Sequence, residues 1–360
     1  DIFINKLDSN GNFISVLGIG GVSQDFAKCL SIDDSGNLYV SGTFAQTVDF
    51  DPGAAAFNLT SNGMNDIFLL KLNSSGAFVW ARSFGGVQND DIRTIKVLNG
   101  SLYVSGWNMS TCDFDPGPSI INYTPLVEID LFISKFSFNG NLLWVRNVGG
   151  VGSELIDDIV SDSKGDLYLT GYFTKNMKVK VNNDSVSLSS NGFRNILFIK
   201  MNTSGDFIWV TDFGGNSTDY GIDLLISSDD QITLCGAFSN SVNFDKSGGV
   251  NIAESNGATD IFIASFTDNT SGIKFIQDEK SKIKIFPNPS NGEVNIISND
   301  LKEIDFVEIY DINGVFIQRL IFDGFNSKFN LNNLVDSIYF FKIFNSDGNL
   351  SYQKWIKINQ

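Results

Sequence analysis

The chain has 360 residues, 42% hydrophobic and 18% charged, which is typical of globular proteins and long enough for two domains. Its net charge of −16 argues against nucleic acid or anionic lipid as a partner, since both require clustered Lys and Arg. The absence of histidine excludes His-ligated metal sites and Ser-His-Asp or Cys-His catalysis. No apolar run reaches about 18 residues, so no transmembrane segment is expected.

A phrase of the form D-x-F-x-x-K-L recurs along residues 1–275. Its copies begin at Asp1, Asp66, Asp130, Asn195 and Asp260, so the step is 64 or 65 residues. A Gly-Gly pair recurs in register at Gly20-Gly21, Gly85-Gly86, Gly149-Gly150 and Gly214-Gly215. Self-similarity at a fixed period is the signature of a repeat architecture. The predicted repeats lie near residues 1–65, 66–129, 130–194 and 195–259, with a partial repeat at 260–275.

Each repeat is predicted to contribute about four strands. In the first complete unit they are residues 27–33, 37–44, 66–73 and 77–84, joined in two pairs by tight glycine turns. The run IFLLKL at 67–72 is apolar on both faces, which a strand needs only when its sheet is covered on both sides. Radially stacked four-stranded blades give that cover. We therefore predict an all-β fold of β-propeller blades, with the extra length of each repeat around residues 50–65.

Three motifs recur together in these repeats: the D-x-F-I/L-x-K-L/F strand, an S-x-G-x-F-x-W hairpin and the L-Y-V-S-G strand. Together they resemble the bacterial β-propeller repeat family often called SBBP, over about residues 1–275. The resemblance implies a propeller of extracellular bacterial proteins with little assigned chemistry. Four units could close a small ring, but the strands at both ends make one half-blade too many. Because the chain starts at Asp1 without Met or a signal peptide, we expect a leader upstream, and either further blades or an open arc.

The repeat rhythm stops near residue 276. Residues 276–283 are predicted to be a linker, and residues 284–360 alternate short strands with N-G, D-G and P-N-P turns. This alternation predicts a small antiparallel β-sandwich of roughly seven strands as the second domain.

The turn and strand residues of this C-terminal domain occur in a distinctive order. They are Pro287, Asn288, Pro289, Gly292, Tyr310, Asp311, Gly314, Ile338 and Tyr339. In this order they look like the C-terminal sorting domain of the type IX secretion system (the Por secretion tail) of Bacteroidetes-type bacteria, although Ser337 replaces the usual Gly. The resemblance implies a domain read by the type IX export machinery, and hence an extracellular or outer-membrane-surface location.

Two pairs of aspartates, Asp49 with Asp51 and Asp113 with Asp115, are candidates for a metal site. Both stand in a D-F-D-P-G phrase on extended chain, so the two carboxylates of each pair leave the same face. Such oxygens suit Ca²⁺, and no other cofactor is expected. The alternative, favoured by the Pro-Gly that follows, is that they cap a turn. The third repeat has VKVN (179–182) at this place, so it would lack the site.

Several residue types recur at one repeat position and are interpreted as architecture. The tryptophans Trp80, Trp144 and Trp209 are expected to pack between strands. The lysines at the K of the repeated phrase, including Lys71 and Lys200, are expected to pair with the Asp that begins the same strand. The three cysteines, Cys29, Cys112 and Cys235, occupy unrelated positions and are predicted to be free thiols. Function is sought where copies disagree, as at Lys175, Lys178 and Lys180.

For catalysis, only a carboxylate-pair mechanism such as glycoside hydrolysis is compatible with the composition. Neighbouring acids occur at Asp90-Asp91, Asp157-Asp158 and Asp229-Asp230. Adjacent residues on a strand point to opposite faces, so they make poor acid and base partners. No catalytic residue is predicted.

The sequence therefore predicts a secreted or cell-surface, non-catalytic binding protein whose propeller loops contact a glycan or protein ligand. Two alternatives remain open. One is a fragment of a secreted carbohydrate-active hydrolase with its catalytic part upstream or in the propeller channel, and the other is a structural adhesin.

Overall fold

The computed structural model describes residues 1–127, 129–182, 184–246, 251–269, 272–275, 283–286, 290–298, 304–311, 315–321, 326–345 and 350–357. The chain divides into two compact units, Asp1–Ile276 and Gln277–Gln360. Every regular element among the described residues is a β-strand, which confirms the all-β prediction. None of these residues belongs to a helix long and apolar enough to cross a membrane.

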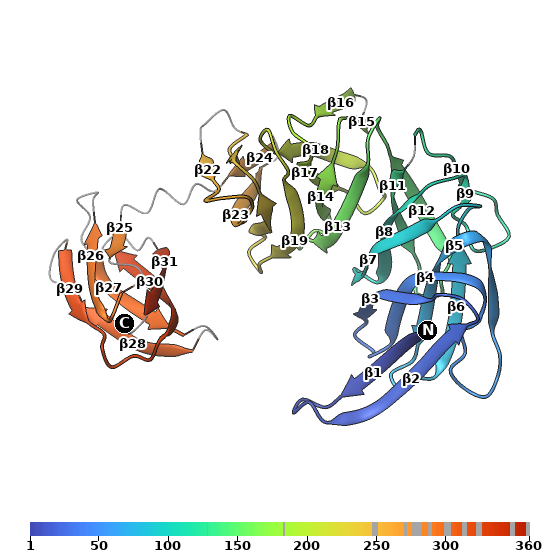
Figure 1. The fold of residues 1–360 in the computed structure, drawn as a ribbon, viewed down its shortest axis with the longest axis horizontal. Coiled ribbons are helices and arrows are strands. Elements are labelled where there is room, and N and C mark those ends of the chain that lie inside the picture. Colours follow the sequence, from blue (N-terminus) through green and yellow to red (C-terminus); the bar gives the residue numbers. More distant parts are fainter. Residues whose placement is uncertain are drawn as a thin grey trace. The chain divides into compact units, whose positions relative to one another are not determined.

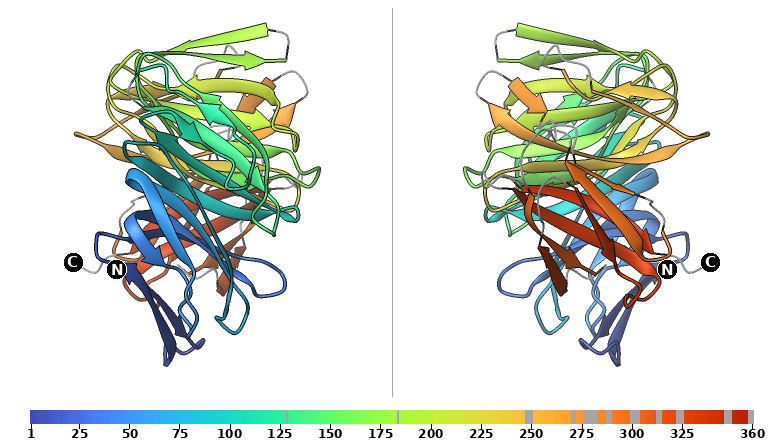
Figure 2. Two further views of the ribbon diagram at one scale, coloured as in Figure 1. Left: turned by 90° about the vertical axis from the view of Figure 1, so that its right-hand side faces the viewer. Right: turned by 90° about the vertical axis from the view of Figure 1, so that its left-hand side faces the viewer.

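The first unit contains four antiparallel four-stranded meanders, which follow one another in chain order (Figures 1 and 2). Sheet one contains β3 (Phe26–Ile32), β4 (Leu38–Asp49), β5 (Asn58–Leu72) and β6 (Phe78–Phe84). Sheet two contains β7 (Asp90–Leu98), β8 (Ser101–Asn108), β11 (Asp130–Phe136) and β12 (Leu142–Val148). Sheet three contains β13 (Glu154–Ser161), β14 (Leu167–Phe173), β17 (Asn195–Met201) and β18 (Phe207–Phe213). Sheet four contains β19 (Tyr220–Ile226), β20 (Ile232–Phe238), β23 (Asp260–Asn269) and β24 (Gly272–Phe275).

The extra length of each repeat forms a second hairpin between the second and third strands of a sheet. These hairpins are β9 (Cys112–Asp113) with β10 (Asn122–Tyr123), β15 (Asn176–Val181) with β16 (Asp184–Ser189), and β21 (Ser241–Asn243) with β22 (Ile252–Glu254). In sheet one the same excursion is a continuation of β4 and β5. A further hairpin, β1 (Ile2–Leu7) with β2 (Phe13–Gly21), joins sheet one where Gly20 and Gly21 of β2 pair with β4.

The four sheets stack face to face, and the stack explains the doubly apolar strands. Neighbouring first strands pack on one another, β3 on β7, β7 on β13 and β13 on β19. Strand β5 in the stack buries Ile67, Phe68, Leu69 and Leu70, so both of its faces are covered. The equivalent strand β23 alternates instead: Phe262 and Ala264 are buried, whereas Ile261 is 82% and Ile263 is 74% exposed. One face of sheet four is therefore an uncovered copy of the surface that sheets one to three bury.

The second unit forms two small antiparallel sheets around one core. Its strands are β25 (Ile283–Phe286), β26 (Glu293–Ser298), β27 (Ile304–Tyr310), β28 (Phe316–Ile321), β29 (Asn326–Asn330), β30 (Ser337–Asn345) and β31 (Leu350–Lys357). The sheet orders are β25-β26-β29 and β28-β27-β30-β31. Trp355, Phe341 and Tyr339 lie in the core between residues of both sheets, including Val294 and Ile296 of β26. Nearly all of the predicted linker lies outside the described residues.

Candidate functional site

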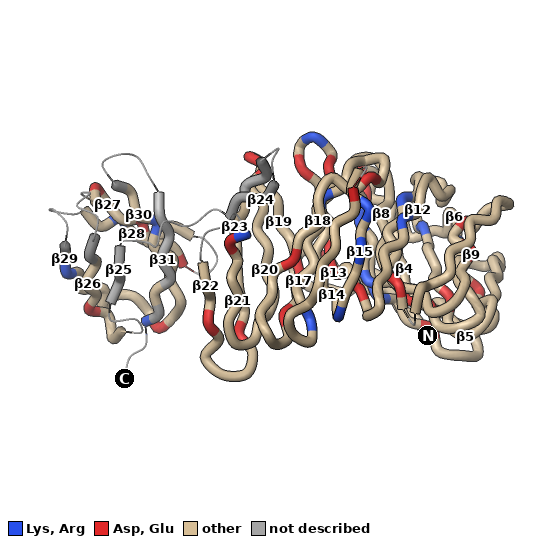
Figure 3. Tube along the Cα trace, turned by 90° about the horizontal axis from the view of Figure 1, so that it is seen from above, with Lys and Arg blue, Asp and Glu red and all other residues tan. Residues whose placement is uncertain are grey.

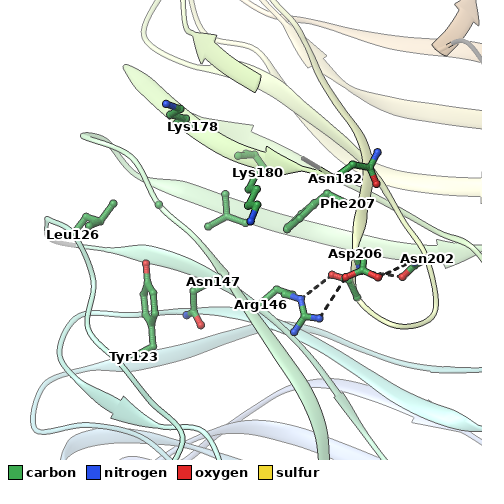
Figure 4. A pocket seen from close by; sticks show the side chains of 14 residues that line it. Tyr123, Leu126, Arg146, Asn147, Lys178, Lys180, Asn182, Asn202, Asp206 and Phe207 are labelled. Atoms are coloured by element: carbon green, nitrogen blue, oxygen red, sulfur yellow. Dashed lines mark hydrogen bonds and ion pairs between the residues drawn. The ribbon is translucent and has the colours of Figure 1, made fainter. Parts of the chain in front are cut away.

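A pocket of about 690 Å³ lies in the repeat unit, between sheets two and three (Figure 4). Strand β12 supplies one wall with Arg146, and the hairpin strand β15 supplies another with Lys178 and Lys180. The turn between β17 and β18 contributes Asp206. Tyr123, at the end of β10, closes the side opposite this turn.

The pocket is locally basic on an acidic chain. In Figure 3 the basic residues of β15 stand out on a unit where red segments predominate. Arg146 is held in place because its guanidinium donates to the carbonyl oxygens of Gly205 (2.9 Å) and Ser204 (3.0 Å). Its carboxylate partner Asp206 is 3.8 Å away, so the positive charge is only partly balanced. Lys178 and Lys180 are both exposed, and Lys180 points toward Arg146 in Figure 4.

The two lysines replace aspartates. Strand register places Gly21 opposite Val48 in sheet one and Gly150 opposite Met177 in sheet three, so Met177 occupies the position of Val48. It follows that Lys178 stands where Asp49 and Asp113 stand in the other repeats, and Lys180 where Asp51 and Asp115 stand. The third repeat was predicted to lack the aspartate pair, but the basic pocket built in its place could not be seen without the packing of β15 beside β12.

The aspartates predicted as calcium ligands cap their own loops. Oδ1 of Asp49 accepts the backbone N–H groups of Asp51 (3.1 Å) and Phe57 (2.8 Å). In the same way, Oδ1 of Asp113 accepts the backbone N–H groups of Asp115 and Ile121. Asp51 and Asp115 each accept the N–H of the glycine two residues later, at 2.8 and 2.9 Å. Within the described residues, no three His, Cys, Asp or Glu side chains converge as metal ligands.

A second set of acids, which sequence reasoning missed, is buried where successive sheets meet. In every repeat an acid follows the second glycine of the Gly-Gly pair by four residues, and in three of them that glycine's N–H donates to its carboxylate. The first glycine leaves room for the residue that begins the repeated phrase, because a Cβ on Gly85 would lie 2.4 Å from Cγ of Asp66. The Gly-Gly pair therefore brings two acids together, Asp66 with Asp90 and Asp130 with Glu154. We call these four residues the junction carboxylates.

The junction carboxylates are at most 1% exposed, and each has at least one oxygen without a hydrogen-bond donor among the described residues. Burial raises the pKa of Asp66 to about 6. Burial, reinforced by the neighbouring Asp66, raises the pKa of Asp90 to about 7. Burial and the charge of Asp130 raise the pKa of Glu154 to about 8. The constant spacing of four residues after the glycine pair was the sequence signal that could have identified them.

Apart from Asp90, which is a junction carboxylate, the neighbouring acids considered for catalysis are tied to cations or hydroxyl groups. Asp91 pairs with Lys28, Asp157 with Arg93 and Asp158 with Lys96, each between adjacent sheets. Asp229 and Asp230 accept hydrogen bonds from Ser227 and Ser163.

The expected pairing of the repeated lysines with the strand-initial Asp is wrong. Lys71 lies 4.9 Å above the ring centre of Tyr39 and donates to the carbonyl of Phe138 in the next repeat. Asp66 lies five residues earlier on the same strand, about 17 Å away at roughly 3.3 Å per residue, so the two cannot meet. Trp80 donates to the same carbonyl at 3.0 Å, so the repeated lysine and tryptophan together bind a neighbouring turn. The three cysteines are free thiols, as predicted.

The sorting residues are placed in part. Pro287, Asn288, Pro289 and Gly314 lie outside the described residues. Gly292 adopts a φ of +118°, and a Cβ there would lie 2.1 Å from Oδ1 of Asn332, so glycine is required. Asp311 follows β27 and exchanges hydrogen bonds with Val315 across the turn. On β30, Tyr339 is buried and donates to the carbonyl of Val335 at 2.9 Å, while its neighbour Ile338 is half-buried. Tyr310 donates to Glu308.

The solved structures that match this chain show only distant likeness. The extracellular domain of a one-component system from B. thetaiotaomicron is 12% identical with a TM-score of 0.21, covering 98% of this chain and 61% of that chain. A glycoside hydrolase family 32 protein from Bifidobacterium adolescentis is 10% identical with a TM-score of 0.30, covering 95% and 66%. Likeness at this level assigns neither a fold nor an activity.

Two curated relatives match parts of the chain. An uncharacterized WD repeat-containing protein of Acanthamoeba polyphaga mimivirus is 24% identical over 258 residues, covering 61% of this chain and 18% of that protein. The regulatory protein FlaEY of Caulobacter vibrioides is 24% identical over 165 residues, covering 44% and 17%. The chain thus spans less than a fifth of the length of these relatives.

The C-terminal unit has a clear match. Residues 284–359 fit the family model of the secretion system C-terminal sorting domain. This tail indicates export by type IX secretion, so the protein is directed to the cell surface or the extracellular space.

Proposed function

We propose that this chain is an exported, non-catalytic binding protein whose repeat unit holds an acidic glycan in the basic pocket between sheets two and three. The observation that supports the proposal most directly is the charge reversal at Lys178 and Lys180. Other repeats have aspartate or asparagine at the first position and aspartate at the second, which cap the local turn. The third repeat gives up that cap and presents two exposed lysines that line the pocket, of which Lys180 points toward Arg146 (Figure 4).

The pocket chemistry suits a carboxylate- or sulfate-bearing sugar. Three cations surround a space large enough for a few sugar rings, since ligand pockets typically measure about 300–1,000 Å³. Nδ2 of Asn147, a residue that lines the pocket, is buried and has no hydrogen-bond acceptor among the described residues, so a small rotation of the side chain would let it donate to a ligand. Guanidinium and amide donors together favour planar anions over single halide-like ions.

The same pocket supports binding better than hydrolysis. Glycoside hydrolysis requires two carboxyl groups flanking the scissile bond. Among the described lining residues, Asp206 is the one carboxylate, and it faces Arg146. Three acids on the first strands of the sheets, Asp91, Asp157 and Asp158, are held in ion pairs with lysine or arginine.

The test is binding of polygalacturonate and chondroitin sulfate to the full chain by isothermal calorimetry, with dextran as the neutral polymer. The variant Lys178→Asp/Lys180→Asp restores the residues of the other repeats, so the hairpin should still fold. We expect this variant to lose at least tenfold in affinity for the acidic polymers. A matched variant with the same change in charge, Lys6→Asp/Lys164→Asp on distant turns and strands, should retain it. Equal losses in both variants, or tight binding of dextran, would refute the proposal.

Export rests on the C-terminal unit and is tested separately. In a type IX-competent host, a chain that ends at residue 276 should accumulate in the periplasm, while the full chain reaches the surface or the medium. Arrival of the truncated chain outside the cell would show that the tail is dispensable. Because the purified repeat unit can still be assayed for glycan binding, the two parts of the proposal fail independently.

A further inference from the structure

Two departures from the repeat meet at one buried point. The second-strand residue that pairs with the first residue of the repeated phrase is Phe44, Phe173 and Phe238 in sheets one, three and four, but Asn108 in sheet two. The acid after the Gly-Gly pair is Asp25, Asp90 and Asp219 in three repeats, but Glu154 in the third. Asn108 is more polar than the phenylalanine of the other repeats, and Glu154 is longer than their aspartate. Both changes place a side-chain oxygen near Asp130.

Strand register and packing bring these side chains together. Asn108 pairs across the sheet with Asp90 on one side and with Asp130 on the other, so all three side chains leave the same face. Strand β13, which begins at Glu154, packs against both β8 and β11. The glycine pair contacts both acids, since a Cβ on Gly149 would lie 2.1 Å from Asp130 and one on Gly150 would lie 2.9 Å from Glu154.

The oxygens at this point lack hydrogen-bond donors. Asn108, Asp130 and Glu154 are each 0% exposed. Within the described part of the chain, no donor reaches Oδ1 of Asn108 or Oδ1 of Asp130, and neither oxygen of Glu154 accepts a hydrogen bond of good geometry, although the N–H of Gly150 faces that carboxylate and lowers its pKa. The other polar atoms are used: Nδ2 of Asn108 donates to the Ser110 carbonyl at 2.8 Å. Oδ2 of Asp130 accepts from the hydroxyl of Tyr123 at 2.6 Å and from the N–H of Leu126 at 3.0 Å.

Four buried oxygens that lack well-placed donors cost free energy unless a proton or a cation lies between them. An unpaired buried carboxylate loses its hydration without compensation, and two of them also repel each other. Asn108 favours a cation over a proton, because a proton can neutralise a carboxylate but does not bind to an amide oxygen at ordinary pH. A cation would satisfy the amide and both carboxylates together.

We propose that Asp130, Glu154 and Asn108 form a buried Ca²⁺ site where the end of sheet two meets the first strand of sheet three. Calcium favours carboxylate and amide oxygens and accepts bidentate carboxylates. Two carboxylates and one amide provide the anionic and neutral ligands. Transition metals prefer imidazole or thiolate ligands, which this cluster lacks among its described residues. The site is distinct from the exposed aspartates at Asp49, Asp51, Asp113 and Asp115, whose oxygens already accept backbone N–H groups.

The site also has an access route. Tyr123 and Gly149, which touch Asp130, line the pocket of Figure 4, so the cluster lies directly behind one pocket wall. The calcium proposal does not require that the pocket bind a glycan.

The test uses the full chain, stripped with EDTA and dialysed, and titrated with Ca²⁺ by calorimetry at pH 7.5. We expect one ion per chain and a rise in Tm on its binding, because a ligand of the native state stabilises it. Asn108→Phe restores the residue of the other repeats, and Glu154→Gln removes one charge. Each should weaken Ca²⁺ binding at least tenfold. The control Asp113→Asn/Asp115→Asn should leave it unchanged.

Several outcomes would overturn the assignment. One is the absence of calcium binding by the wild-type chain, in which case the two acids share a proton. Another is loss of binding only in Asp113→Asn/Asp115→Asn, which would place calcium in the loop instead. If Asn108→Phe unfolds the chain, the variant Glu154→Asp is used in its place. It keeps the negative charge but shortens the side chain to the length found in the other repeats. Unchanged calcium affinity in Glu154→Asp would then refute the site.

Discussion

Two groups of aspartates in the repeat unit, identical in residue type, differ in what surrounds their oxygens. The junction carboxylates, such as Asp90, are buried between sheets with an oxygen that no described donor reaches. The turn carboxylates, which we define as Asp8, Asp33 and Asp162, begin tight hairpins and accept several hydrogen bonds each. Oδ1 of Asp33 accepts the N–H groups of Ser35 and Asn37, and Oδ2 accepts from the Asn37 amide at 2.9 Å.

Asp90 and Asp33 therefore titrate in opposite directions. Burial raises the pKa of Asp90 above its ordinary value. Burial alone would also raise the pKa of Asp33, but hydrogen bonds from Asn37, Tyr39 and Ser35 outweigh it and lower the pKa. The comparison teaches that a carboxylate in this fold stabilises the chain only where donors reach both of its oxygens, since Asp66, Asp90 and Asp130 each accept a backbone N–H at one oxygen and lack a described donor at the other. At the junctions its charge costs free energy unless a proton or a cation is present.

The largest expected effect is a pH dependence that follows from this contrast. Because the pKa values of Asp66, Asp90 and Glu154 are raised to about 6, 7 and 8, their protonated forms favour the folded state. That contribution is complete below about pH 4 and is lost as pH rises through these values. In EDTA, the free energy of unfolding of the repeat unit should fall by several kcal/mol between pH 5 and pH 9, measured by urea denaturation.

The variant Asp90→Asn sharpens this prediction. It keeps an oxygen for the N–H of Gly86 but removes the charge beside Asp66. At pH 8.5 in EDTA it should raise the midpoint of unfolding, whereas the turn variant Asp33→Asn should not. A flat pH profile, or destabilisation of Asp90→Asn at pH 8.5, would contradict the view that the junction charge is unfavourable.

The next effect concerns the glycine that makes the junction possible. A Cβ on Gly149 would meet Asp130 at 2.1 Å, so Gly149→Ala must displace the carboxylate or part the sheets. Overpacking of this kind costs about 2–3 kcal/mol. Gly18→Ala on β2, where no atom lies within 4 Å of the new Cβ, is the matched control and should change stability by less than about 0.5 kcal/mol. Equal effects in both variants would show that the glycine pair is needed only for backbone freedom.

The sequence reveals the turn carboxylates and hides the junction ones, for a physical reason. A hairpin such as that of Asp33 is set by residues within four positions, so its turn can be predicted from the local phrase. The all-β class follows from the same local periodicity. Asp66 and Asp90 are 24 positions apart, and their proximity depends on how one sheet stacks on the next. In the sequence, only the constant four-residue spacing between the Gly-Gly pair and the following acid indicates this proximity.

The candidate sites show the same division. Lys178 and Lys180 were singled out because they break the repeat, but the pocket they line requires β15 to lie beside β12. Asn108 also differs from the phenylalanine of the other repeats, but sequence reasoning missed it, because asparagine near the end of a strand is typical of a turn. The aspartate pairs proposed as calcium ligands were correctly placed on one segment. The sequence could not show that backbone N–H groups occupy their oxygens.

A moderate effect is expected from removing a turn carboxylate. Asp33→Ala deletes the acceptor for two backbone N–H groups, for the Asn37 amide and for the Tyr39 hydroxyl at 3.1 Å. Loss of such a cap costs about 1–2 kcal/mol. Thermal unfolding at pH 7 measures it, and Asp33→Asn, which keeps an acceptor oxygen, should recover at least half of the loss. If Asp33→Ala proves neutral, water replaces the carboxylate at no cost.

The smallest effect is predicted at the hairpin aspartates, where the repeats supply their own control. Asp113 accepts two N–H groups through Oδ1, at 3.2 and 2.9 Å, and Asn243 accepts the equivalent two at 3.0 and 2.9 Å in the fourth repeat. An amide oxygen therefore serves this loop as well as a carboxylate. Asp113→Asn should change the free energy of unfolding by less than about 0.5 kcal/mol, whereas Asp113→Ala should cost about 1 kcal/mol. A large loss in Asp113→Asn, restored by millimolar Ca²⁺ in the wild type alone, would mean that the charge of this loop serves a cation. The contrast between the two groups of aspartates would then have to be redrawn.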